Sequence, residues 1–159
     1  MKKYYTSIQP NRGNFEFIGD EIEIQDYNTI SAKWRAKPDY WFFADHWPDK
    51  PLVPAVIQLE VIFQNLALLF FANPRYKKEE YVLVTAIRQA KFLQQITPGM
   101  EIDIKGKIIK NVRGIAQLSG ELFYSKSIVC YCKFDVYLEK EFSEISPWLS
   151  MNSQAGDAL

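Results

Sequence analysis

The sequence predicts an α+β domain in which one long central helix is wrapped by a curved antiparallel sheet of five or six strands. Three observations lead to this fold class. A nearly continuous apolar run occupies residues 52–72, strand-like segments lie on both sides of it, and short turn sequences separate the later segments. We expect a single domain over residues 1–140. A loosely ordered tail is expected over residues 141–159, where hydrophobic periodicity is lost.

Two strands are expected ahead of the apolar run. The segments "FEFIGDEIEIQDY" (15–27) and "TISAKWRA" (29–36) are rich in aromatic and β-branched residues. Such residues fit the pleated, half-buried surface of a sheet, so both segments are predicted as strands.

The apolar run itself is predicted as a helix. Pro54 suits the first helical position, and the Asn73-Pro74 pair ends the helix because a residue before proline avoids the helical region. The helix then has about 19 residues, and with almost no polar face it must be covered nearly all round. Four polar side chains lie inside the run: Gln58, Glu60, Gln64 and Asn65. A carboxylate near a bilayer centre is costly, so we expect a buried helix and no membrane insertion.

Four further strands are expected after the helix. They are "EYVLVTAIRQAKFL" (80–93), "MEIDIKGKII" (100–109), "GIAQLSGELFY" (114–124) and "SIVCYCKFDVYLE" (127–139). The turn sequences at 97–99, 111–114 and 124–127 leave connections short enough for antiparallel neighbours.

The last predicted strand carries both cysteines of the chain, Cys130 and Cys132. Residues two apart share a face of a strand, so both thiols are expected in the core as reduced, cytosolic cysteines. One histidine and two cysteines do not supply a metal site, so no metal is expected.

Charge and the amino-terminal segment exclude two classes of function. The chain has 19 basic and 19 acidic residues and no basic stripe, so no nucleic-acid partner is expected. The start, "MKKYYTSIQPNRG", has no apolar segment behind its lysines, so a secretory signal is not expected and a cytoplasmic location is.

Two titratable groups frame the start of the helix. His46, the only histidine, precedes the proline-rich stretch "WPDKPLVP", and Glu60 stands inside the apolar run with Gln64 four residues on. Taken singly, such a histidine is more often structural, and a helical glutamate more often reaches solvent or pairs with a lysine. Together they offer a base and an acid, because apolar surroundings would raise the pKa of the Glu60 carboxyl and keep it protonated.

The helix start offers a third feature. Its free backbone N–H groups, including that of Ala55, suit an oxygen that gains negative charge. Base, acid and oxyanion site in one region suggest proton abstraction next to a carbonyl, and they leave the substrate open.

The stretch "FFADHWPDKPLVPAVIQLEVIFQ" resembles the active-site segment of the hotdog-fold 3-hydroxyacyl-[acyl-carrier-protein] dehydratases. The family pattern has a histidine, phenylalanine and proline, then a proline–glycine pair, an acid fourteen residues after the histidine and a glutamine four beyond it. Here these positions hold His46-Trp47-Pro48, Pro54-Ala55, Glu60 and Gln64. The segment "AKFLQQITPGMEIDIKGKI" extends the similarity, which covers roughly residues 38–138.

The resemblance implies a hotdog homodimer, or a higher oligomer built from dimers, in which His46 of one chain faces Glu60 of the other. His46 would remove a proton next to the thioester, and Glu60 would protonate the departing 3-hydroxyl to leave a trans-2-enoyl thioester. The Ala55 N–H would bind the thioester oxygen, and Pro54, Val56 and Gln64 would contact the substrate. Acyl carrier protein would be the partner; its phosphopantetheine would carry the acyl chain, and no other cofactor is implied.

The sequence departs from the family pattern at Ala55, Asp45 and Asp49, each a common glycine position. Two alternatives therefore stay open beside an active dehydratase of fatty acid or related acyl-chain synthesis. One is a hotdog acyl thioesterase, and the other is a non-catalytic hotdog subunit that binds acyl thioesters.

Overall fold

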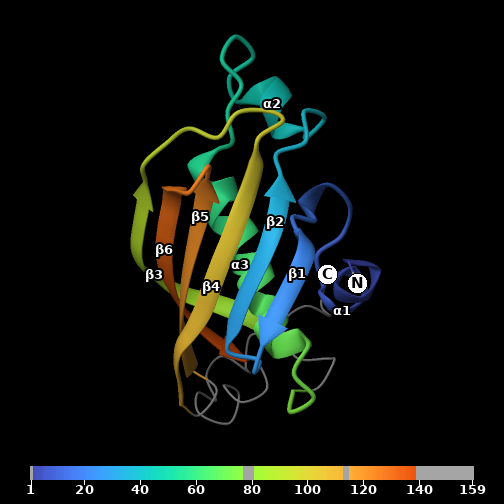
Figure 1. Ribbon diagram of the computed structural model, residues 1–159, viewed down its shortest axis with the longest axis vertical. Helices are drawn as coiled ribbons and strands as arrows, with labels where there is room; N and C mark the ends of the chain where they lie inside the picture. The colour runs from blue at the N-terminus through green and yellow to red at the C-terminus, as the bar shows by residue number, and fades with distance from the viewer. Residues whose placement is uncertain (1, 77–80, 113–114, 139–159) are drawn as a thin grey trace, which may run out of the picture.

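A computed structural model describes residues 2–76, 81–112 and 115–138, and one long helix lies against one face of a six-stranded sheet (Figure 1). The helices are α1 (Lys2–Ile8), the 3-10 turn η1 (Gly13–Phe15), α2 (Phe42–Asp45) and α3 (Ala55–Phe71). The strands are β1 (Asp20–Gln25), β2 (Thr29–Arg35), β3 (Val82–Phe92), β4 (Glu101–Val112), β5 (Ile115–Tyr124) and β6 (Ser127–Leu138). The predicted tail at 141–159 lies outside the described residues.

The sheet has the strand order β1-β2-β4-β5-β6-β3, and every neighbouring pair is antiparallel. β3 precedes β4 in the chain but occupies the edge beyond β6. α3 packs against β2 to β6, so the sheet curves around the helix. The predicted α+β class, with one helix wrapped by an antiparallel sheet, is confirmed.

Two glycines let α3 approach the middle of the sheet closely. Gly106 of β4 and Gly120 of β5 are direct cross-strand partners. A Cβ atom on Gly106 would overlap the side chain of Leu66, and one on Gly120 would overlap that of Ile62. Because both helix residues are fully buried, these glycines provide the room in which the helix packs.

Both ends of the long helix are close to prediction. Pro54 is the N-cap residue and not the first helical residue, because its ψ of 144° is extended. α3 therefore has 17 residues. Within the described part of the chain, no helix has the length and apolar character needed to cross a bilayer. The cytoplasmic location stays a prediction.

The expected covering of the helix is incomplete within one chain. Val56 is 70% exposed, and Leu59, Glu60 and Phe63 are only partly buried. Spacings of three and four residues place these four side chains on one face of α3. The amino-terminal half of the helix thus presents an open, mostly apolar stripe with Glu60 inside it.

The prediction of one strand over residues 15–27 is wrong in its first part, since β1 begins only at Asp20. Residues 15–19, here named the N-terminal strap, instead bond to side chains of α3. The short helices α1 and α2 were not predicted, because neither is long enough to show a helical period.

The cysteine strand agrees with its prediction. Cys130 and Cys132 are both buried free thiols on β6. Burial raises the pKa of the Cys130 thiol to about 12, so it packs as an uncharged core side chain.

Candidate active site

Glu60 lies on the second turn of α3 and is half-buried. The amide nitrogen of Gln64 donates a hydrogen bond to Glu60 Oε1 over 2.8 Å, so the expected i, i+4 pair is formed. Burial raises the pKa of the Glu60 carboxyl above its ordinary value, and the bond from Gln64 opposes this rise. The net direction is upward, which favours the protonated acid.

Gln64 is 2% exposed and its amide is held by the N-terminal strap. Its Oε1 accepts the backbone N–H of Phe17 over 2.8 Å, and its Nε2 also donates to the carbonyl oxygen of Phe15 over 2.9 Å. Both amide hydrogens are therefore used, one on the strap and one on Glu60. The predicted contact of Gln64 with substrate stays a prediction. Within the chain, both hydrogens of its amide are already engaged.

Asn65, the next residue of α3, holds the strap one step further on. Its Oδ1 accepts the N–H of Gly19 over 2.9 Å, and its Nδ2 donates to the carbonyl oxygen of Phe17 over 3.1 Å. Sequence reasoning did not find this role. The available signal was a pair of consecutive amides inside an apolar helix, because buried amides need hydrogen-bond partners.

His46 follows α2 directly, and its backbone N–H bonds to the carbonyl oxygen of Phe42 over 2.8 Å. Its Nδ1 lies 3.3 Å from the carbonyl oxygen of Leu52. A carbonyl can only accept, so this contact assigns the ring proton to Nδ1 and leaves the lone pair on Nε2. The imidazole is partly buried and stacks on the ring of Trp47, with 4.6 Å between centroids.

The amino terminus of α3 presents the expected free N–H groups. Pro54 is the N-cap, and the first intrahelical bond is that of Gln58 to the Pro54 carbonyl oxygen. The backbone N–H of Ala55 has no acceptor inside the helix by geometry, and the Ala55 and Val56 side chains are exposed. This end of the helix can therefore receive an oxygen that becomes negative.

The fold brings some of the predicted residues together and leaves others apart. Glu60 and Gln64 are bonded, and Pro54, Ala55 and Val56 are consecutive at the helix start. No hydrogen bond or ion pair joins His46 to Glu60 within the described part of the chain. One chain thus holds each candidate group separately.

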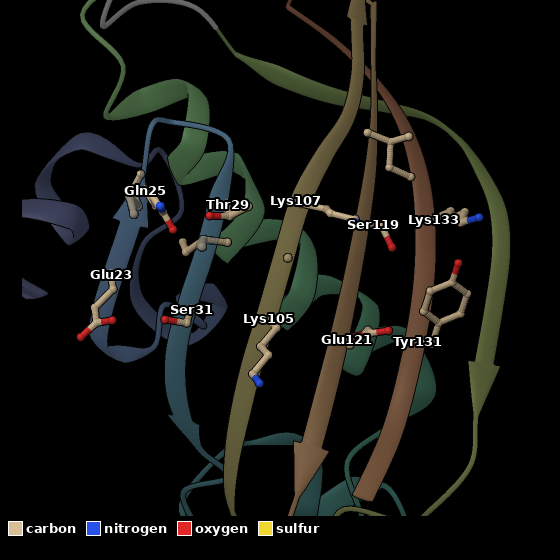
Figure 2. Close-up of a pocket in the computed structure, with 14 residues that line it drawn as sticks. Glu23, Gln25, Thr29, Ser31, Lys105, Lys107, Ser119, Glu121, Tyr131 and Lys133 are labelled. Atoms are coloured by element: carbon tan, nitrogen blue, oxygen red, sulfur yellow. The ribbon is translucent and has the colours of Figure 1, made fainter. Parts of the chain in front are cut away.

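A hollow of about 780 Å³ lies on the opposite face of the sheet, away from α3 (Figure 2). It is lined by polar and charged side chains of β1, β2, β4, β5 and β6, among them Lys105, Lys107, Glu121 and Lys133. Neither His46 nor Glu60 lines it. Among the described residues, no cluster of three histidine, cysteine or acidic side chains is placed to hold a metal ion.

Residues 22–122 match the sequence profile of the ApeI-like family, described as ApeI dehydratase. The chain belongs to the ApeI-like dehydratase family. The matched range is well over half of the chain and contains His46, Ala55, Glu60 and Gln64. The resemblance to hotdog dehydratases is confirmed.

Similar proteins of known name are also dehydratases. The 3-hydroxyacyl-[acyl-carrier-protein] dehydratase FabZ of Actinobacillus succinogenes is 24% identical over 131 residues, covering 82% of this chain and 87% of the relative. The protein of the same name from Haemophilus influenzae is also 24% identical, with coverages of 82% and 88%.

Solved structures confirm the hotdog fold of this family member. A chain of the dehydratase heterocomplex ApeI:P from Xenorhabdus doucetiae superposes with a TM-score of 0.70 at 12% identity, covering 89% of this chain and 95% of that one. A hypothetical thioesterase protein with coenzyme A from Streptococcus pneumoniae gives 0.56 at 11% identity, with coverages of 74% and 84%. At such identities the likeness concerns the fold alone.

Proposed function

We propose that this protein dehydrates a 3-hydroxyacyl thioester to the trans-2-enoyl thioester, with the acyl chain carried on the phosphopantetheine of acyl carrier protein. The observation that carries the proposal is the state of Glu60. It is a half-buried carboxyl with a raised pKa, held by Gln64 within an apolar stripe of α3. A carboxyl kept neutral in such surroundings is suited to donate a proton.

The chemistry follows from the two side chains and the helix start. His46 Nε2 takes the proton from the carbon next to the thioester, and the electron pair moves toward the thioester oxygen. The Ala55 N–H, at the positive end of α3, stabilises the charge on that oxygen. As the double bond forms, Glu60 gives its proton to the 3-hydroxyl, which leaves as water. After this step His46 is protonated and Glu60 is ionised. The extra proton on His46 then returns to Glu60, directly or through solvent, which restores the site.

We assign each site to two subunits. Within one chain His46 and Glu60 share no hydrogen bond, and the stripe of Val56, Leu59, Glu60 and Phe63 is open. A second copy that covers the stripe would bury Glu60 further and bring its own His46 to the carboxyl. A homodimer therefore satisfies the requirements of the fold and of the chemistry together.

The direct test is to incubate the protein with 3-hydroxyacyl and trans-2-enoyl pantetheine thioesters of several chain lengths and follow their interconversion. Wild type should interconvert them, while His46→Ala and Glu60→Gln should each abolish turnover with the melting temperature retained. Lys107→Met, in the hollow on the outer face, is the control and should leave turnover unchanged. Full turnover by both site variants would refute the assignment, and release of free thiol would identify a thioesterase.

A further inference from the structure

The N-terminal strap is attached to α3 by an unusual set of bonds. Four backbone groups of the strap pair with the side-chain amides of two consecutive helix residues, Gln64 and Asn65. These bonds span 46 to 49 residues of sequence and have donor–acceptor distances of 2.8 to 3.1 Å. The two amides thus take the place of a neighbouring strand, and they fix the strap at a defined position along the helix.

The two amides differ in what lies beyond them. Gln64 donates its second amide hydrogen to the Glu60 carboxyl, whereas Asn65 donates its second amide hydrogen to the carbonyl oxygen of Val61. Only Gln64 connects the strap to a candidate catalytic group. Asn65 holds the same strap but contacts neither Gln64 nor Glu60 through any hydrogen bond in the described residues.

The aromatic ring of Phe17 anchors the middle of the strap. Phe17 is fully buried, and its ring meets those of Tyr40 and Phe42 with centroid separations of 5.5 and 6.2 Å. Phe42 is the first residue of α2, whose end leads directly into His46. The strap is therefore packed against the same aromatic layer that supports the histidine loop.

The orientation of one amide decides which oxygen of Glu60 bears the acid proton. The Phe17 N–H must face Gln64 Oε1, and the Phe15 carbonyl must face Nε2, so an N–H of Gln64 points to Glu60 Oε1. The proton of a neutral carboxyl is then expected on Oε2, the oxygen that accepts no bond from Gln64. If the amide turned over, its oxygen would accept that proton in an internal hydrogen bond and withhold it.

We propose that the N-terminal strap is a positioning element for the acid step, with Phe17 and Asn65 as positioning residues that keep the Gln64 amide in its donating orientation. The inference rests on the proposed dehydratase function and deepens it. Neither residue touches the reacting atoms, and both act through Gln64. The strap therefore sets where the proton of Glu60 lies and how readily it is lost.

The test compares Asn65→Ala and Phe17→Leu with wild type in the full-length protein. Asn65→Ala removes two bonds to the strap and leaves Gln64 and Glu60 intact, while Phe17→Leu keeps the backbone bonds and removes the ring. Gln9→Ala is the matched control, because Gln9 is 1% exposed and its amide also makes two backbone hydrogen bonds, both to Asn11. It has no bond to the strap among the described residues.

The readout is the pH profile of kcat/KM on a 3-hydroxyacyl pantetheine thioester, with kcat, KM and the melting temperature measured alongside. Loss of the donated hydrogen bond raises the pKa of Glu60, so the descending limb should move to higher pH in both strap variants. We also expect kcat to fall about tenfold with KM nearly unchanged, because ground-state binding is intact. Gln9→Ala should lower the melting temperature only.

Two outcomes would overturn the proposal: strap variants that lose melting temperature but keep the wild-type limb and kcat, or an equal limb shift in Gln9→Ala. If Asn65→Ala does not fold, Phe17→Leu decides alone. Failure of the proposed function is distinct, since wild type would then convert no 3-hydroxyacyl thioester. The strap proposal alone would fail in one case. Wild type would be active and Glu60→Gln inactive, but the strap variants would have the same pH profile and kcat as Gln9→Ala.

Discussion

The two candidate catalytic groups are held in very different ways. Glu60 accepts a hydrogen bond from Gln64, one turn further along α3. Gln64 is itself tied to the N-terminal strap by two hydrogen bonds of 2.8 and 2.9 Å. His46 has one long contact, 3.3 Å from Nδ1 to the Leu52 carbonyl oxygen, and a stack on Trp47, which is 57% exposed. Within one chain the acid is thus held by a chain of short hydrogen bonds, and the base by one long contact and one neighbouring ring.

This difference concerns the surface that a second subunit would cover in the proposed homodimer. The loop with His46 projects at the end of the molecule where α3 begins (Figure 1), and the stripe around Glu60 is open on the same helix. One partner surface would remove both the exposed tryptophan beside the base and the open apolar stripe beside the acid from water. The hydrogen bonds of the acid side are thus formed within one chain, while the proposed homodimer would complete the base side.

Subunit mixing gives the largest expected effect. His46→Ala and Glu60→Gln proteins, each inactive, should recover activity when unfolded together and refolded as a mixture. Random pairing makes half of the dimers mixed, and each mixed dimer has one intact site of two, so roughly a quarter of wild-type turnover is expected. Turnover by the refolded mixture is compared with that of each variant refolded alone. A mixture as inactive as its parents would place both groups of a site in one chain.

Replacing Gln64 should have the next largest effect and would test the rigid side of the comparison. Gln64→Leu removes the bond to Glu60 together with both bonds to the strap, so we expect kcat to fall about tenfold to a hundredfold. The descending limb of the pH profile should also move to higher pH, since the bond that lowers the pKa of Glu60 is lost.

Gln58→Leu is the matched control for this prediction, because Gln58 is also a buried glutamine of α3. It bonds to the Val53 carbonyl oxygen over 3.2 Å and not to Glu60. Its variant should keep the wild-type limb. A Gln64→Leu profile that overlays wild type would show that Glu60 needs no support from this amide.

The sequence was sufficient to predict the helix and the pairing on it, because both depend on local rules. Helix boundaries follow from Pro54 and Asn73-Pro74, and the Glu60–Gln64 bond follows from a spacing of four. Strands β5 and β6 alternate with a period of two, whereas β3 was predicted from its mostly apolar composition and not from alternation.

The strap was misread because "FEFIG" alternates as a strand does. Its hydrogen-bond partners are side chains of a helix 46 to 49 residues later in the chain, and no local pattern records such a partner. The contacts around His46 were unreadable for a related reason. They depend on a loop conformation and, in the proposed homodimer, on a second copy of the chain, which the spacing from His46 to Glu60 implies only through the resemblance.

Trp47 offers a smaller test on the open side. Its ring is nearly parallel to that of His46, with 17° between the planes, and limits rotation of the imidazole. Trp47→Ala should lower kcat about threefold to tenfold, while Trp47→Phe, the residue of the family pattern, should stay close to wild type. Trp41→Ala is the control, since Trp41 is also exposed but makes an edge-to-face contact with Phe42 and does not stack on the histidine. Equal losses in both alanine variants would show a general effect of the loop.

The smallest expected effect is on stability and concerns Glu60 alone. Its folded pKa is raised above the ordinary value of 4.5, so the folded state resists ionisation and wild type loses stability as pH rises from 4.5 through the folded pKa. Glu60→Gln keeps an acceptor for Gln64 and cannot ionise. Its melting temperature should equal that of wild type below about pH 4, where both side chains are neutral, and exceed it by a few degrees at about pH 8. Because the burial that raises this pKa would grow when a second subunit covers the stripe, the gap should widen at protein concentrations that favour the dimer. A wild type that becomes more stable than Glu60→Gln as pH rises would mean that the fold prefers the ionised carboxylate, and that Glu60 is poised as a base.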